Sequence, residues 1–165
     1  TGDFLASTPD QWDQSYRVNI AGPMMFCQAV IPTMQAQNGG RIVNIGSTGS
    51  LGAQAGFGAY TVMKHGLIGL SNTIAAEFGV NNILCNTVCP GFIATDMHMG
   101  TNKRLAAAAG LSVEAIKEQR YQEVALRRAG QPSEVADTVA FLAGPQGAYI
   151  TGASLPVSGG VPCGI

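Results

Sequence analysis

The 165-residue sequence predicts an α/β fold built on a parallel sheet. Stripes of apolar residues with helical spacing alternate along the chain with short apolar runs typical of buried strands. The predicted order is helix, strand, helix, strand, helix, helix, strand, and helical connections bring successive strands back in the same direction. Apolar residues make up 46% of the chain, which is enough for a packed core and excludes a disordered protein.

The first predicted helix begins after Thr8, where Pro9 suits the first helical position and Gln11 completes a capping box. One apolar face then follows every three or four residues, formed by Trp12, Tyr16, Ile20, Met24, Cys27, Ile31 and Met34. Pro23 has no N–H, so we expect a kink or break there and a freed carbonyl at Asn19.

Two strands and a second long helix follow the turn Asn38-Gly39-Gly40. Residues 41–47 (RIVNIGS) are apolar and β-branched and predict a buried strand. A Gly-rich loop leads to a helix over about 59–78, again with one apolar stripe. Residues 83–89 predict another buried strand, which Pro90-Gly91 ends.

The last third of the chain predicts two more helices and a strand. Residues 95–110 show no clear period and are expected to form a loop or lid. Ser112 can cap a helix that reaches about residue 128, and Ser133 can cap another that ends near Leu142. Residues 155–157 predict a short final strand between Gly-rich segments.

The charge composition excludes two classes of partner. Nine basic and ten acidic residues give a net charge of −1, with no basic stripe of the kind that binds nucleic acid. The sequence contains no run of 18 apolar residues, so no membrane-spanning helix is expected. Charged residues make up only 12%, about half the usual fraction, which suggests that a ligand crevice or subunit contacts hide part of the surface.

The chain has four cysteines, at positions 27, 85, 89 and 163, and none forms a Cys-x-x-Cys motif. On one strand, Cys85 and Cys89 would lie about 13 Å apart, too far for a disulfide. We therefore expect reduced, packed thiols and a cytoplasmic protein. No metal site is expected, because His65 and His98 do not cluster with the cysteines, and His98 is expected to be exposed in the lid.

Three residues predict a site for acid/base chemistry. Tyr60 and Lys64 are four apart and share one helix face, and an ammonium beside a phenol stabilises the phenolate. Ser47 ends a strand at the edge where open α/β sheets bind ligands, and Tyr60 opens the next helix from that same edge. On spacing alone, an ordinary helix surface and a serine that satisfies loop backbone remain the alternatives.

Asn19 is a further candidate for this site. Its freed carbonyl could hold a proton-carrying water near the Tyr60/Lys64 pair. A proline kink without chemistry is the alternative.

As a set, these motifs resemble the short-chain dehydrogenase/reductase family. They are Asn19, the segment VNIGS that ends at Ser47, Tyr60-x-x-x-Lys64, CPGFIATD from residue 89 and GASLPVSGG from residue 152. Order and intervals agree, with Ser47 standing 13 residues before Tyr60, and the resemblance covers residues 8–160. It implies a Rossmann-type doubly wound parallel sheet.

The resemblance also implies a role for each residue of the motifs. Tyr60 would exchange a proton with the substrate oxygen, Ser47 would orient that oxygen, and Asn19 would hold the water of a proton relay. Lys64 would bind the nicotinamide ribose together with Tyr60, and it would assist Tyr60. Beyond Pro90 and Gly91, the Ile93 backbone and Thr95 would hold the carboxamide of NAD or NADP.

The sequence departs from the family pattern in two places. The Gly-rich dinucleotide loop and the strand with the Asn-Asn-Ala-Gly motif do not occur, so the sheet is expected to lack its N-terminal strands. We therefore expect residues 1–165 to be one domain, the carboxyl part of a longer oxidoreductase, with a substrate lid at 95–130. Ser158 stands where the family often has Asp, which affects the last turn and not the chemistry.

The function implied is NAD(P)-dependent hydride transfer between nicotinamide and a secondary alcohol or ketone, such as a diol, a polyol or a similar small carbonyl compound. Reduction of 3-oxoacyl thioesters is the enzymatic alternative, and a non-catalytic fragment that acts only in subunit assembly is the other. The two long helices, 8–35 and 59–78, resemble the family's subunit-packing surface and imply a homo-oligomer, a tetramer or a dimer.

Overall fold

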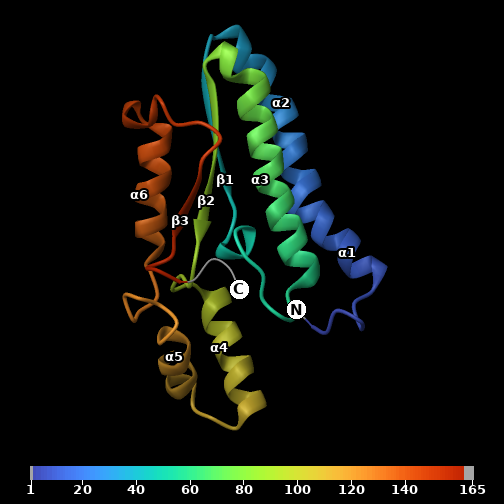
Figure 1. Cartoon of the computed structure of the whole chain (residues 1–165), viewed down its shortest axis with the longest axis vertical. Helices are drawn as coiled ribbons and strands as arrows, with labels where there is room; N and C mark the ends of the chain where they lie inside the picture. Colours follow the sequence, from blue (N-terminus) through green and yellow to red (C-terminus); the bar gives the residue numbers. More distant parts are fainter. Residues whose placement is uncertain (1, 162–165) are drawn as a thin grey trace.

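A computed structural model describes residues 2–161, and its centre is a parallel sheet of three strands in the order β1-β2-β3 (Figure 1). The strands are β1 (Gly40–Ile45), β2 (Ile83–Pro90) and β3 (Ser154–Val157). This confirms the predicted parallel α/β fold. Cys163 lies outside the described residues.

The register of the sheet places the carboxyl ends of β1 and β2 side by side. Gly40 pairs with Ile83 and Ile45 pairs with Val88, so the two strands run together over six residues. The shorter β3 pairs only with the second half of β2, as far as Pro90 and Val157. Segments that leave β1, β2 and β3 at this end therefore start from the same edge of the sheet.

The N-terminal helix is divided where the sequence predicts a kink. It consists of α1 (Pro9–Tyr16), a five-residue π-helix, η1 (Arg17–Ala21), and α2 (Gly22–Ala36). The Gly22 N–H donates to the carbonyl of Arg17, which widens the turn directly before Pro23. The helix continues beyond Pro23, as expected from the apolar face that reaches Met34, and it tolerates Pro32 as well.

The capping box at the start of α1 is confirmed. Thr8 Oγ1 accepts from the backbone N–H of Gln11 at 3.4 Å, and Gln11 Oε1 accepts from the N–H of Thr8 at 3.0 Å. Two of the unpaired N–H groups at the helix N-terminus are satisfied in this way.

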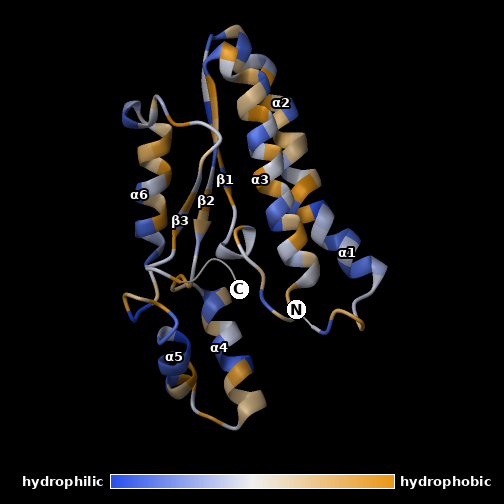
Figure 2. Ribbon diagram, in the orientation of Figure 1, coloured by the Kyte–Doolittle hydropathy of each residue, from blue (hydrophilic) through white to orange (hydrophobic). Residues whose placement is uncertain are grey.

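The sheet is covered on both faces (Figure 1). On one face lie α2 and α3 (Gly58–Phe78), and on the other lies α6 (Pro132–Ala143). An apolar core cluster joins the sheet to α2 and α3 and includes Cys27, Ile31, Ile74 and Cys85. Figure 2 shows apolar residues along the lengths of α2 and α3.

The expectation of a loop at 95–110 is wrong. Residues Asp96–Ala109 form a helix, α4, and α5 (Val113–Tyr121) follows it below the sheet in Figure 1. Thr95 caps α4 by accepting from the His98 N–H at 3.4 Å, and Gly110 ends it with a φ of +65°. The weak amphipathic pattern hid this helix, although its run of four alanines favours one.

Two other helix boundaries also differ from those expected. Helix α5 ends at Tyr121 rather than near residue 128, and Arg127 has a φ of +55°, which no helix accommodates. Helix α6 begins after Gln131 rather than Ser133, because Pro132 takes the first helical position and Glu134 accepts from the Gln131 N–H at 2.6 Å.

The first strand is less buried than expected. It spans Gly40–Ile45 rather than 41–47, and the side chain of Ile45 is 47% exposed. Among the described strands β1 has a neighbour only on its β2 side, so its other edge is uncovered. By contrast, residues 83–89 of β2 are all buried, as predicted.

Other expectations concern the membrane, metals and cysteines. Across residues 2–161, no helix has the length and apolar character needed to cross a membrane. That part of the chain also holds no group of three or more His, Cys, Asp or Glu side chains placed to bind a metal. Cys27 and Cys85 are buried free thiols, and burial raises the pKa of Cys85 to about 12, so Cys85 packs the core as a neutral thiol.

Candidate active site

Ser47 follows the carboxyl end of β1 in an extended conformation, with φ −164°. Its Oγ accepts from the Gly49 N–H at 3.1 Å and caps a short 3-10 helix, Thr48–Ser50. Ser47 therefore satisfies a backbone N–H of the loop, as the alternative interpretation expected. However, a hydroxyl that accepts one hydrogen bond still has its own proton to donate, so Ser47 remains able to polarise a ligand oxygen.

Tyr60 lies beside Ser47, in the first turn of α3. A Cβ placed on Gly49 would stand 3.3 Å from Cε1 of Tyr60 and 3.5 Å from Oγ of Ser47. The tyrosine ring and the serine hydroxyl thus flank one small space that glycine leaves open. The Tyr60 side chain is 36% exposed, so a ligand can reach it.

Lys64 connects this pair to the end of β1. Its Nζ donates to the carbonyl of Ile45 at 2.9 Å and lies 5.7 Å from the centroid of the Tyr60 ring. Burial lowers the pKa of Lys64, and an electrostatic interaction with Cys89 opposes that shift. The structure therefore brings Ser47, Tyr60 and Lys64 together at one edge of the sheet.

Asn19 lies in the π-helical turn η1, which packs against α3. The contact is close, because Ile20 Cδ1 lies 3.0 Å from where a Cβ on Gly66 would stand. The Asn19 side-chain amide donates to the carbonyl of Ser15 at 2.9 Å, within its own helix. Its turn therefore borders the helix of Tyr60 and Lys64, while its side chain is engaged locally.

The segment after β2 leaves from the same edge. Gly91 donates to the Val157 carbonyl at 3.0 Å, and a Cβ on Gly91 would stand 2.9 Å from the Cα of Ser158, so only glycine fits there. Ile93 forms a bridge with Gly130, and the Ala94 N–H donates to the Gly130 carbonyl at 2.8 Å. These bonds join the two ends of the segment that contains α4 and α5.

The expectation that His98 is exposed is wrong. His98 is 8% exposed, because α4 is a helix that turns this side chain toward α5. The sequence did not predict its polar neighbours either. They are far apart in a region without a clear apolar pattern, so no regular spacing indicates that they meet.

The donor set at this edge fits the nicotinamide end of a dinucleotide. The Lys64 ammonium has three N–H donors and one is used by Ile45, which leaves two for ribose hydroxyls. Tyr60 and Ser47 supply hydroxyls beside it. The fit covers this end alone, because the described residues contain no Gly-rich turn of the kind that holds a pyrophosphate.

Comparison with known proteins places the chain in a family. A family model described as enoyl-(acyl carrier protein) reductase matches residues 1–162. The chain is 42% identical over 161 residues to the short-chain dehydrogenase/reductase olcF of Penicillium canescens, which covers 94% of this chain and 61% of that protein. The chain belongs to the short-chain dehydrogenase/reductase family. The family resemblance expected from Asn19, Ser47, Tyr60 and Lys64 is thus confirmed.

Two further relatives extend the comparison. The chain is 39% identical over 159 residues to (3R)-3-hydroxyacyl-CoA dehydrogenase of Rattus norvegicus, covering 96% of this chain and 57% of that one. It is 28% identical to 4-hydroxyisoleucine dehydrogenase complexed with NADH, with a TM-score of 0.81, covering 99% and 65%. This likeness confirms the Rossmann-type fold, and relatives in this family use NAD or NADP. The chain spans about three fifths of the curated relatives' length.

Proposed function

We propose that this chain carries the catalytic part of an NAD(P)-dependent oxidoreductase that transfers a hydride between nicotinamide and a secondary alcohol or ketone. The observation that supports this most is the convergence of Ser47 and Tyr60 on the space beside Gly49, with the Lys64 ammonium next to them. A phenol, a hydroxyl and a cation at one ligand-accessible edge provide what proton exchange with an alcohol oxygen needs.

In the proposed mechanism each residue handles a proton or a hydrogen bond. Tyr60 takes the proton of the alcohol during oxidation and returns it during reduction, while Ser47 donates to the same substrate oxygen. Lys64 stabilises the phenolate by its charge and binds the ribose hydroxyls. Asn19 holds a water that passes the proton to solvent. A bound dinucleotide would accept the hydride during oxidation and supply it during reduction.

The segment after β2 is proposed to hold the nicotinamide ring. Pro90 and Gly91 turn the chain away from the sheet edge, and the close approach of Ser158 fixes that turn. The Ile93 backbone and the Thr95 hydroxyl are proposed to bind the carboxamide. The bridge between Ile93 and Gly130 supports this assignment, because it keeps the segment in place.

The substrate is proposed to be a small or moderately apolar secondary alcohol, a diol, or the corresponding ketone. The relative named for 4-hydroxyisoleucine supports a small alcohol, whereas the relative named for 3-hydroxyacyl-CoA supports the thioester alternative. Residues 95–130 are the proposed lid, and Met97, Leu105 and Leu111 expose apolar side chains there. Reduction of 3-oxoacyl thioesters remains the enzymatic alternative.

The proposed function can be tested by following the absorbance of the reduced nicotinamide cofactor as it forms. Secondary alcohols, diols and 3-hydroxyacyl thioesters are each offered with NAD and with NADP. Reduction of one cofactor by an alcohol or diol supports the proposal, and a strong preference for the thioester supports the alternative. If a longer protein that includes the nucleotide-binding part gives no hydride transfer with any of these substrates but still associates, the assembly fragment is the better account.

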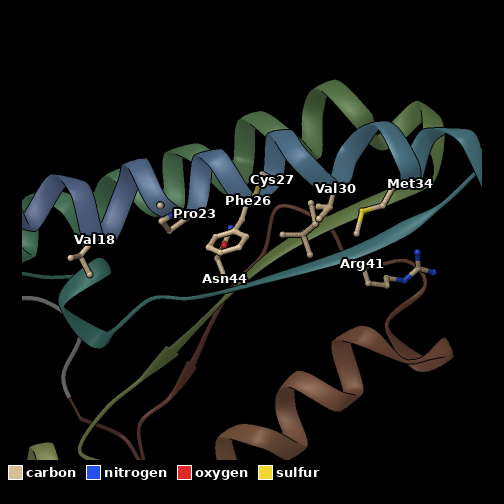
Figure 3. Close-up of a pocket in the computed structure, with 10 residues that line it drawn as sticks. Val18, Pro23, Phe26, Cys27, Val30, Met34, Arg41 and Asn44 are labelled. Atoms are coloured by element: carbon tan, nitrogen blue, oxygen red, sulfur yellow. The ribbon is translucent and has the colours of Figure 1, made fainter.

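A groove beside the free edge of β1 is the proposed contact for the nucleotide-binding part. It has a volume of about 510 Å³, and its lining includes Val18, Phe26, Val30 and Met34 from the N-terminal helices. Figure 3 shows these side chains above β1 and Phe26 above Asn44. An unpaired strand edge beside exposed apolar side chains favours a further strand there.

This placement predicts that residues 1–165 alone bind NAD(H) weakly. Lys64, Ile93 and Thr95 reach only the nicotinamide end, whereas a dinucleotide depends on a Gly-rich turn for its pyrophosphate. Calorimetry should give a dissociation constant weaker than about 1 mM, which corresponds to roughly 4 kcal/mol of binding free energy. Micromolar affinity of residues 1–165 for NAD(H) would contradict the proposal that another part of the protein binds the pyrophosphate.

Ser47→Ala should lower the turnover rate and leave cofactor affinity unchanged, because the hydroxyl acts on the substrate oxygen. Ser47→Thr, which keeps a hydroxyl, should recover part of the rate. The substitution to Ala also removes a cap worth about 0.5–2 kcal/mol. Thr8→Ala removes a comparable cap from α1 and serves as the matched control. Equal turnover rates in the Ser47→Ala and Thr8→Ala variants would show that Ser47 takes no part in the mechanism.

The protein is proposed to be a homo-oligomer, a tetramer or a dimer, that pairs through α2 and α3. Met25 on α2 is 64% exposed and Val62 on α3 is 51% exposed, and a self-complementary apolar face suits a two-fold axis. Sedimentation should show at least a dimer, and Val62→Asp should shift it toward monomer. Val80→Asp, at a 90% exposed position outside these helices, is the control. A monomeric native protein would contradict this proposal.

A cytoplasmic location is also proposed. The buried free thiols of Cys27 and Cys85 support a reducing compartment. Fractionation of cells that express the protein tests this.

A further inference from the structure

A cluster of polar and aromatic side chains is buried between α4 and α5. His98 and Asn102 on α4 are 8% and 0% exposed. Nε2 of His98 lies 3.1 Å from Nδ2 of Asn102 and 3.1 Å from the hydroxyl of Tyr121, and the Arg120 guanidinium donates to Oδ1 of Asn102. The mechanism proposed above uses none of these residues, although buried polar groups require partners of matching chemistry.

The partners in this cluster fix the protonation state of His98. A guanidinium has only donors, so Asn102 must turn its carbonyl oxygen to Arg120 and its amide N–H to His98. Nε2 of His98 then has to accept, which it does only as a neutral imidazole with its proton on Nδ1. A protonated His98 would set an N–H against the N–H of Asn102.

The same cluster holds the segment that follows β2. The Phe92 ring stacks on His98 with centroids 5.6 Å apart, and the Arg120 guanidinium lies 4.3 Å from the Phe92 centroid. His98 also stacks on Tyr121, with centroids 6.0 Å apart. Phe92 precedes Ile93, so these contacts connect both lid helices to the proposed nicotinamide-binding segment.

We propose that His98, Asn102 and Arg120 are positioning residues that fix residues 92–95 and the lid helices α4 and α5, and that this arrangement persists only while His98 is neutral. Its consequence for cofactor binding rests on the proposed function. The arrangement itself rests on contacts within the chain and can be measured without catalysis.

The direction of the pH dependence follows from the surroundings of His98. Burial lowers the pKa of His98 below its ordinary value of about 6.5, and the Arg120 and Lys117 cations on α5 act in the same direction. The other groups against the ring are the uncharged side chains of Asn102 and Phe92 and the hydroxyl of Tyr121. A lowered histidine pKa means that the stabilisation is complete above about pH 6.5 and is lost as the pH falls through the folded value.

Nuclear magnetic resonance of the 165-residue chain tests this with the His65 ring as an internal reference. At neutral pH, ring nitrogen shifts should show His98 neutral with its proton on Nδ1. As the pH falls, the backbone amides of residues 92–95 should shift with the same midpoint as His98. A proton on Nε2, or amides that stay fixed while His98 titrates, would overturn the proposal whether or not the chain is an oxidoreductase.

Two substitutions should raise the His98 midpoint by about one pH unit or more. Asn102→Asp puts a carboxylate against Nε2, which favours the protonated ring. Arg120→Met frees the Asn102 amide to rotate and accept from a protonated ring, and it keeps an apolar stem over Phe92. Lys117→Met removes the other cation without touching Asn102, so its effect should be smaller. If Arg120→Met and Lys117→Met raise the His98 midpoint equally, charge repulsion alone explains the shift. That result would overturn the proposed orientation of the Asn102 amide.

Discussion

Tyr60→Phe should abolish turnover in the active protein while cofactor affinity stays nearly unchanged. The phenol proton is needed only when the substrate oxygen gains or loses its own, and the ring remains in place beside Ser47 and Gly49. General acid/base groups contribute roughly 10²–10⁴-fold, so the rate should fall by at least that factor. Steady-state rates with saturating cofactor, together with cofactor titrations, separate the two effects.

Tyr149→Phe is the matched control for that substitution. Tyr149 is fully exposed in the turn after α6, far along the chain from the site, and the loss of its hydroxyl should leave the rate unchanged. Near-normal turnover in the Tyr60→Phe variant would be enough to reject the mechanism, because a group other than Tyr60 would then have to exchange the proton with the substrate oxygen.

The parts of the fold with strong local signals were predictable. Strand β2 is a mostly apolar run interrupted by Asn86 and Thr87, and its residues 83–89 are buried. The capping box at Thr8 and Gln11 marked the start of α1 to the residue. Pro23 likewise located the irregular turn η1, since a residue without an N–H must disturb the helix around it. In each case one local physical requirement decided the structure.

Elements that depend on tertiary contacts were predicted less well. Helix α4 carries polar residues on a buried face, such as His98 and Asn102, so its apolar pattern is weak. Their burial is stabilised by partners on α5, about 20 positions later, which no spacing rule detects. The burial of β1 was overestimated for a related reason, because an apolar run cannot show whether a neighbouring strand covers it.

The candidate site could be predicted from the sequence only in part. The spacing of Tyr60 and Lys64 put them on one helix face, and the position of Ser47 after a strand put it at the ligand edge. Both side chains lie against Gly49, within 3.5 Å of where a Cβ on that glycine would stand. The sequence offered no sign of that contact, since glycines are frequent throughout the loop that contains it.

Lys64→Met should weaken cofactor binding and slow turnover together, because one ammonium serves both the ribose and the Tyr60 phenolate. For the wild type, the rate of alcohol oxidation should rise with pH, because the oxidation releases a proton. The Lys64→Met variant should be slower throughout that range, since no cation then stabilises the developing phenolate. Initial rates across pH with saturating and limiting cofactor measure both effects.

The burial of Lys64 adds a second pH dependence. Because burial lowers the Lys64 pKa from its ordinary value of about 10.4, the ammonium loses its charge at a lower pH than an exposed lysine does. Cofactor affinity should therefore fall as the pH rises through that lowered value. In Lys64→Arg the cation stays charged, and affinity at high pH should no longer fall. Lys103→Met, on the exposed side of α4, should behave as wild type. If Lys64→Met and Lys103→Met give the same cofactor affinity and the same rate profile, Lys64 is only an ordinary helix residue.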